Sequence, residues 1–376
     1  MPALLLVVIA LLWPGAVAVA DQKGPPEQAL EAGIRATVEA GVLPALVAFD
    51  ERVAGFDRAT RALCETPGEG KLNAARDAWR ALANAWARVG VLRFGPLTGG
   101  FPVRLAWRLD AYRMDRRPRA VEEAIEVASV SDVPIDAAYI ESVSTFAKSL
   151  RAFERLLFDR PDAAGEALAT FRDDPRRCAY LRGLSTAYVT DAAAFVEHWR
   201  DGDDPYAEEL AHPGASGSEF FRTQDAVDRV MNAVITSLDV LTRDELGKPL
   251  GRDADNARPW VLASPVARHS AAEIEATLDG LAMLFFNRWQ DRDGRGLDDA
   301  LRESGEAALV ARVEARFAAA REALAALPAP LVVSVREHRG AAERVLAELN
   351  RLKAVFKVDV ANALWVTLDF NATDGD

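Results

Sequence analysis

Apolar residues recur at three- and four-residue spacing along nearly the whole chain, which is the pattern of amphipathic helices. Ala, Leu, Arg and Glu dominate these stretches, and all four favour helix. No series of alternating strands joined by hairpin turns is seen. The pattern predicts an all-α fold. Its clearest stretches are Ala78, Leu82, Ala85, Trp86 and Val89; Leu181, Leu184, Tyr188, Ala192, Phe195 and Trp199; and Ile274, Leu278, Leu281 and Phe285.

Proline and glycine divide the predicted helices. Pro44 is expected to kink the first long one, because proline removes a backbone donor. The longest irregular region, 202–217, is rich in Asp, Pro and Gly, and we take it as a linker. It would separate an N-terminal helical bundle over 21–201 from a C-terminal bundle over 218–376. A second loop-rich region, 247–265, lies inside the C-terminal bundle.

The amino terminus resembles a secretory signal peptide. Residues 4–12 are apolar, and Ala18-Val19-Ala20 before Asp21 is a small-x-small cleavage site. We predict a signal peptide over 1–20 and a mature protein in the periplasm or cell envelope; the alternative is an uncleaved anchor. Because no Cys follows the run, a lipoprotein anchor is excluded. No later segment is long and apolar enough to predict a transmembrane helix.

Composition narrows the classes of partner. A chain of 376 residues with 50% hydrophobic residues can fold as two globular domains. Its net charge of −12 argues against non-specific nucleic-acid binding, which needs clustered Lys and Arg. The charge itself selects no small ligand.

The chain has two cysteines, Cys64 and Cys178. In an oxidising compartment they can form a disulfide, and we favour this over two separate buried thiols. The bond would close a long loop and stabilise the fold by roughly 4–5 kcal/mol if loop entropy dominates.

The most informative segment is Ser149-Leu150-Arg151-Ala152-Phe153-Glu154-Arg155-Leu156-Leu157-Phe158. It resembles the signature of the imelysin family, which reads Gly-x-His-x-x-Glu followed by an apolar run. Glu154 and the apolar run are present. Ser149 replaces the Gly, and Arg151 replaces the His, so a permanent cation stands where the family has a metal ligand.

Two further stretches are similar to the same family. Arg93-Phe94-Gly95-Pro96 looks like an Arg-x-Gly-Pro turn, and the ending from Leu364 to Asp376 is similar to a terminal pattern that closes on Asp-Gly-Asp. The resemblance implies two helical bundles related by a rough internal twofold, with the signature helix near the cleft between them. It also implies either peptidase activity or a role in periplasmic iron uptake.

Three interpretations of the signature remain open. Arg151 and Glu154 lie three residues apart, one helical turn, so they can form an ion pair that fills the vacated site. Alternatively, Arg151 centres a pocket for an anionic ligand, and Glu154 orients the guanidinium. Arg93 is a further candidate ligand-binding residue. Last, Glu154 is a metal ligand, although one carboxylate without His or Cys makes a poor transition-metal site.

The histidines give no zinc-peptidase motif, since His-Glu-x-x-His is absent. His269 and Glu273 are four residues apart and could share a helix face. We expect instead that Ser270 and Glu273 form a capping box, which would leave His269 outside the helix. No catalytic residue is therefore assigned.

These observations favour an imelysin-like envelope protein that binds a ligand, linked to iron or other metal acquisition, over an enzyme. One alternative is an imelysin-type metallopeptidase, and another is a structural or partner-binding envelope protein without a small ligand. A divalent or iron cation is the cofactor to consider. The sequence does not identify the ligand or partner protein.

Overall fold

The computed structural model describes residues 24–92, 94–95, 100–111, 119–159, 164–201 and 205–369. Helices dominate these ranges. The strands found there are β1 (Arg288–Trp289) and β2 (Arg292–Asp293), which pair as one short antiparallel hairpin. The all-α prediction is confirmed. The predicted signal peptide, Arg93 and the last seven residues of the chain lie outside the described ranges.

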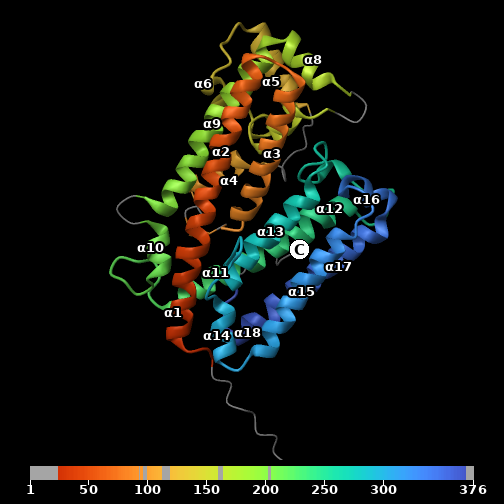
Figure 1. Cartoon of the computed structure of the whole chain (residues 1–376). Helices are drawn as coiled ribbons and strands as arrows, with labels where there is room; N and C mark the ends of the chain where they lie inside the picture. Colours follow the sequence, from red (N-terminus) through yellow and green to blue (C-terminus); the bar gives the residue numbers. More distant parts are fainter. Residues whose placement is uncertain are drawn as a thin grey trace, which may run out of the picture.

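The helices form two groups (Figure 1). The first group contains α1 (Glu27–Ala36), the π-helical segment η1 (Thr37–Val42), α2 (Leu43–Glu65), α3 (Glu69–Val89), α4 (Gly100–Leu109), α5 (Ala120–Val130), α6 (Ala137–Ser142), the 3₁₀ turn η4 (Thr145–Ala147), α7 (Leu150–Leu157), α8 (Glu166–Asp173) and α9 (Pro175–Arg200). Within it, α2 packs along both α3 and α9.

The second group follows α10 (Tyr206–Ala211) and contains α11 (Thr223–Asp239), the π-helical segment η5 (Val240–Gly247), α12 (Lys248–Leu250), the 3₁₀ turn η6 (Pro259–Val261), α13 (Ser270–Phe286), the hairpin, α14 (Leu297–Glu303), α15 (Ala307–Ala325), α16 (Leu331–Glu337), α17 (Arg339–Ala354), the π-helical segment η7 (Val355–Val360) and α18 (Ala361–Ala363). Helices α15 and α17 pack against each other.

The first helix is continuous from α1 through η1 to α2 and runs along much of the molecule (Figure 1). Pro44 does not end it. The π-helical segment η1 lies just before Pro44, which has no backbone N–H to donate to the preceding turn. By length and composition alone, this helix also qualifies as a membrane span, contrary to the expectation that no segment after the signal peptide is long and apolar enough. Half of its apolar window is buried, and Phe49, Phe56 and Leu63 are core residues.

Helices α3 and α13 form the main contact between the two groups. Gly280 makes their close approach possible: a Cβ atom there would lie 2.3 Å from the backbone oxygen of Arg88. The apolar face predicted for α13 is confirmed, because Ile274, Leu278, Leu281 and Phe285 are all buried. This contact brings polar side chains of the two groups within reach of one another.

The predicted linker at 202–217 contains a helix, α10. Tyr206 on α10 packs edge-on against Trp199 and Phe220, and its hydroxyl donates to Glu219 at 2.7 Å. Helix α1 meanwhile packs against α11 and α14 of the second group. The division into an N-terminal and a C-terminal bundle stays a prediction, and these contacts join its two halves at one end.

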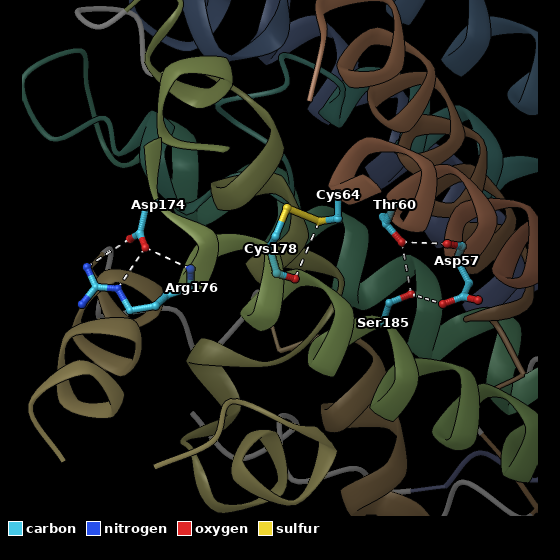
Figure 2. The surroundings of a disulfide bond; sticks show 7 residues. All are labelled: Asp57, Thr60, Cys64, Asp174, Arg176, Cys178 and Ser185. Carbon is cyan, nitrogen blue, oxygen red and sulfur yellow. Dashed lines mark hydrogen bonds and ion pairs between the residues drawn. A yellow bond between two sulfur atoms is a disulfide. The ribbon is translucent and has the colours of Figure 1, made fainter. Parts of the chain in front are cut away.

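The predicted disulfide between Cys64 and Cys178 is confirmed, with the two Cα atoms 5.4 Å apart. Figure 2 shows that it joins the end of α2 to the beginning of α9. About two turns away along each helix, Ser185 of α9 donates to the carboxylate of Asp57 on α2 at 2.8 Å. The covalent bond and this hydrogen bond fix the register of the two longest helices in the first group.

Candidate functional site

The signature forms α7, a short helix that is buried almost entirely. Ser149 precedes it, and its hydroxyl accepts a hydrogen bond from the amide of Arg151 at 3.3 Å. Phe153 stacks edge-on against Phe56 and Tyr188 of neighbouring helices. The indole of Trp79 donates to the carbonyl of Leu150 at 2.9 Å. These contacts hold the helix rigidly and so fix where its two charged side chains lie.

Arg151 bridges the two groups of helices through a pair of carboxylates. Its Nε and Nη2 donate to the two oxygens of Asp110, at 3.0 and 2.9 Å. Its Nη1 donates to Oε1 of Glu273 at 2.7 Å. Asp110 follows α4 of the first group, and Glu273 lies in the first turn of α13 in the second. The indole of Trp86 also donates to Asp110, at 2.9 Å.

This ion cluster is buried, since the side chains of Arg151, Asp110 and Glu273 are 9%, 5% and 4% exposed. Burial disfavours a charged guanidinium, but the two carboxylates outweigh that effect and hold the pKa of Arg151 well above its ordinary value. Burial raises the pKa of Glu273, and the charge of Arg151 opposes this rise. The guanidinium therefore serves as a fixed cation for both carboxylates.

Glu154 binds the second group through backbone amides. Its Oε1 accepts hydrogen bonds from the amides of Val266 and Ala267, at 2.9 and 2.8 Å. These two residues belong to the loop that leads into α13. Burial raises the pKa of Glu154 to about 7, against the lowering effects of the Ala267 amide and of nearby arginines. Glu154 thus anchors this loop and titrates near neutral pH.

A small pocket of about 30 Å³ lies beside the cluster and can hold one or two water molecules. Both groups of helices contribute to it. The oxygen Oε2 of Glu273 is buried, and no hydrogen-bond partner for it is found within the described ranges. The pocket is lined by Trp86, Ala87, Gly90, Val91, Asp110, Arg151, Ser237, Val240, Glu245, Ala263, Glu273 and Thr277.

The prediction of a capping box at the start of α13 is wrong, since no side chain within the described ranges caps this helix. The carboxylate of Glu273 binds Arg151 instead of capping its own helix, and the Ser270 hydroxyl accepts from the amide of Ser264 at 3.0 Å. His269 does precede the helix, as expected. Its Nε2 pairs with Oδ1 of Asn84 at 2.8 Å, and burial lowers its pKa to about 4.

In the part of the chain that the structure describes, no group of three His, Cys, Asp or Glu side chains could hold a metal ion. Arg151 and Glu154 lie on the same buried helix. Arg151 binds Asp110 and Glu273, and Glu154 binds the loop before α13; a direct ion pair between Arg151 and Glu154 stays a prediction. Arg93, the third candidate, lies outside the described ranges. Asp110 and Glu273 were missed because no sequence pattern links them to position 151.

Comparisons with known proteins support the resemblance to the imelysin family. The family model described as Imelysin matches residues 42–356. Iron-regulated protein A of Synechococcus elongatus is 23% identical over 310 residues, which are 82% of this chain and 78% of that protein.

Two solved structures share the fold. A protein described as an iron-regulated protein A precursor from Parabacteroides distasonis has a TM-score of 0.71 at 15% identity, over 89% of this chain and 97% of that one. An imelysin-like protein from Psychrobacter arcticum has a TM-score of 0.73 at 18% identity, over 92% and 98%. The family model spans most of the sequence, so this chain belongs to the imelysin family.

Proposed function

We propose that this protein is a binding member of the imelysin family that serves iron acquisition in the cell envelope and does not hydrolyse peptides. One observation carries the proposal: the guanidinium of Arg151 bridges Asp110 and Glu273 at the signature. A fixed cation occupies the position where the family signature has its His. The protein would then act through a binding surface, with the signature holding its two groups of helices together.

Coordination chemistry supports the loss of metal hydrolysis at this position. A catalytic zinc or iron needs several neutral or anionic ligands and one open coordination position. Arginine has no lone pair to offer at physiological pH. Arg151 also engages both nearby carboxylates and would repel a second cation in a buried site. Glu154 accepts two backbone amides and is partly protonated near neutral pH, which makes it a weaker ligand.

The compartment and the link to iron rest on independent features. The apolar segment before Asp21 has the form of a signal peptide, and a disulfide between Cys64 and Cys178 suits an oxidising compartment. The relative from Synechococcus elongatus is named for its regulation by iron. We therefore expect periplasmic protein that begins near Asp21 and accumulates when iron is scarce.

Two measurements test the proposal: growth of a deletion strain and peptide hydrolysis by the purified protein. A deletion strain should grow more slowly than its parent under iron chelation and equally well with added iron. The purified protein should release no fragments from denatured protein substrates, with or without added zinc. Peptide hydrolysis by the native protein that disappears in Glu154→Gln would overturn the proposal and favour a peptidase. Growth unaffected by iron supply would remove the link to iron acquisition.

A further inference from the structure

A second and larger pocket, of about 430 Å³, opens between the two groups of helices. It lies between α2 and α3 on one side and α13, β1 and α15 on the other, and it shares no lining residue with the pocket beside Arg151. Small side chains leave this space open. They are Ala45, Ala48, Ala81, Ala85 and Ala282. The volume lies within the range of small-molecule sites.

The charged residues that line this pocket are mainly cationic. Asp279 is the carboxylate in the lining, and Arg88 and Arg321 already engage it, at 2.9 and 2.7 Å. The pocket therefore carries more positive than negative charge at its wall. The four arginines in the lining are Arg52, Arg88, Arg288 and Arg321.

The other acidic partners of these arginines lie outside the lining. Arg288 pairs with Glu314 at 2.8 Å, and Arg321 pairs with Glu275 at 2.8 Å. Arg52 is exposed, and within the described ranges it has no ion pair. Its guanidinium thus keeps its hydrogen-bond donors for solvent or a ligand.

Aromatic side chains form one wall of the pocket. The guanidinium of Arg88 lies 5.6 Å from the ring centre of Trp289, and that of Arg288 lies 4.3 Å from the ring centre of Phe286. Phe286 in turn packs edge-on against Phe317. These stacked cations are held in place by the hairpin and α13. The pocket lining therefore combines alanines, aromatic side chains and arginines.

We propose that this pocket binds a small organic anion that has a carboxylate on a flat apolar body. The apolar body would lie over the alanines and against Trp289 and Phe317. The carboxylate would meet Arg52, whose planar guanidinium matches a carboxylate with two parallel hydrogen bonds. Arg288 also lines the pocket and adds attraction for the same charge. This site does not depend on the role proposed for Arg151.

Calorimetric titration with 2-naphthoate and 2-naphthamide tests the site, because the two probes differ in charge at nearly constant shape. We expect naphthoate to bind and naphthamide to bind at least about tenfold more weakly. Arg52→Ala should weaken naphthoate binding by about tenfold or more. Arg58→Ala, another exposed arginine on α2 that does not line the pocket, should leave it unchanged. Thermal unfolding of each variant checks that it is folded.

A second variant tests the location independently of charge. Ala48→Leu places a larger side chain in the lining and should abolish naphthoate binding while the protein remains folded. Absence of naphthoate binding by the native protein would overturn the proposal. So would equal binding of the amide, or binding that neither Arg52→Ala nor Ala48→Leu weakens.

Discussion

Both nitrogens on one edge of the Arg151 guanidinium donate to both oxygens of Asp110, at 3.0 and 2.9 Å. Such a bidentate pair fixes the plane of the guanidinium and leaves its Nη1 directed at Glu273, 2.7 Å away. Because Asp110 and Glu273 come from different groups of helices, a single side chain of the signature connects them. This relationship makes the structural role of Arg151 testable apart from any ligand.

Replacement of Arg151 by Ala should destabilise the protein by about 3–5 kcal/mol, because two buried carboxylates would lose their cation. Urea unfolding followed by circular dichroism measures this change. The matched control is Arg61→Ala, which removes an ion pair to Asp57 from a half-exposed position and should cost no more than about 1 kcal/mol. The combined variant Arg151→Met, Asp110→Asn and Glu273→Gln should recover most of the stability. Equal, small losses for Arg151→Ala and Arg61→Ala would contradict this role.

The elevated pKa of Glu154 predicts how stability depends on pH. Burial raises its pKa in the folded protein to about 7 from an ordinary value of 4.5, so between these values the folded state holds a proton that the unfolded state has lost. Its contribution is therefore fully present below pH 4.5 and is lost as the pH rises through 7.

Comparison with Glu154→Gln isolates this effect, because the amide stays neutral and still accepts from Val266 and Ala267. Relative to the variant, the native protein should lose about 2.5 kcal/mol of stability between pH 5 and pH 8. Chemical denaturation at several pH values gives the difference. Parallel pH profiles for the two proteins would show that Glu154 titrates like an exposed acid.

The disulfide predicts a defined response to reductant. Unfolded, unreduced protein should contain no free thiol, because Cys64 and Cys178 are paired. Reduction should lower the free energy of unfolding by up to about 4–5 kcal/mol, since the bond closes a long loop. The variant in which both cysteines are replaced by Ser should be insensitive to reductant. Two titratable thiols in protein purified without reductant would contradict the pairing.

Local patterns in the sequence predicted much of the fold. The three-and-four spacing of apolar residues located α3, α9 and α13, because the apolar face of a helix can be recognised from the sequence of that helix alone. The Cys64–Cys178 pair followed from composition and compartment. Pro44 was expected to kink its helix, and the structure has a π-helical segment just before it.

The partners in the site could not be predicted in the same way. Glu273 looked like a capping residue, because Ser270 and Glu273 have the local spacing of a capping box. A charge-assisted hydrogen bond to a buried cation stabilises a carboxylate more than a hydrogen bond from a backbone amide does. The long-range pair with Arg151 therefore forms in place of the capping box. Asp110 lies far from Arg151 in the sequence, and the two meet because α4, which Asp110 follows, and α7 both pack against α9.

The most direct test of the central claim is calorimetric titration of the native protein and of Arg151→His with zinc and ferrous iron. We predict that the native protein binds neither metal tightly, because Arg151 is the cation of the site. Arg151→His should gain affinity, since an imidazole would replace that cation beside Asp110 and Glu273. Tight stoichiometric binding by the native protein that is lost in Glu154→Ala would contradict the account and restore a metal site at the signature.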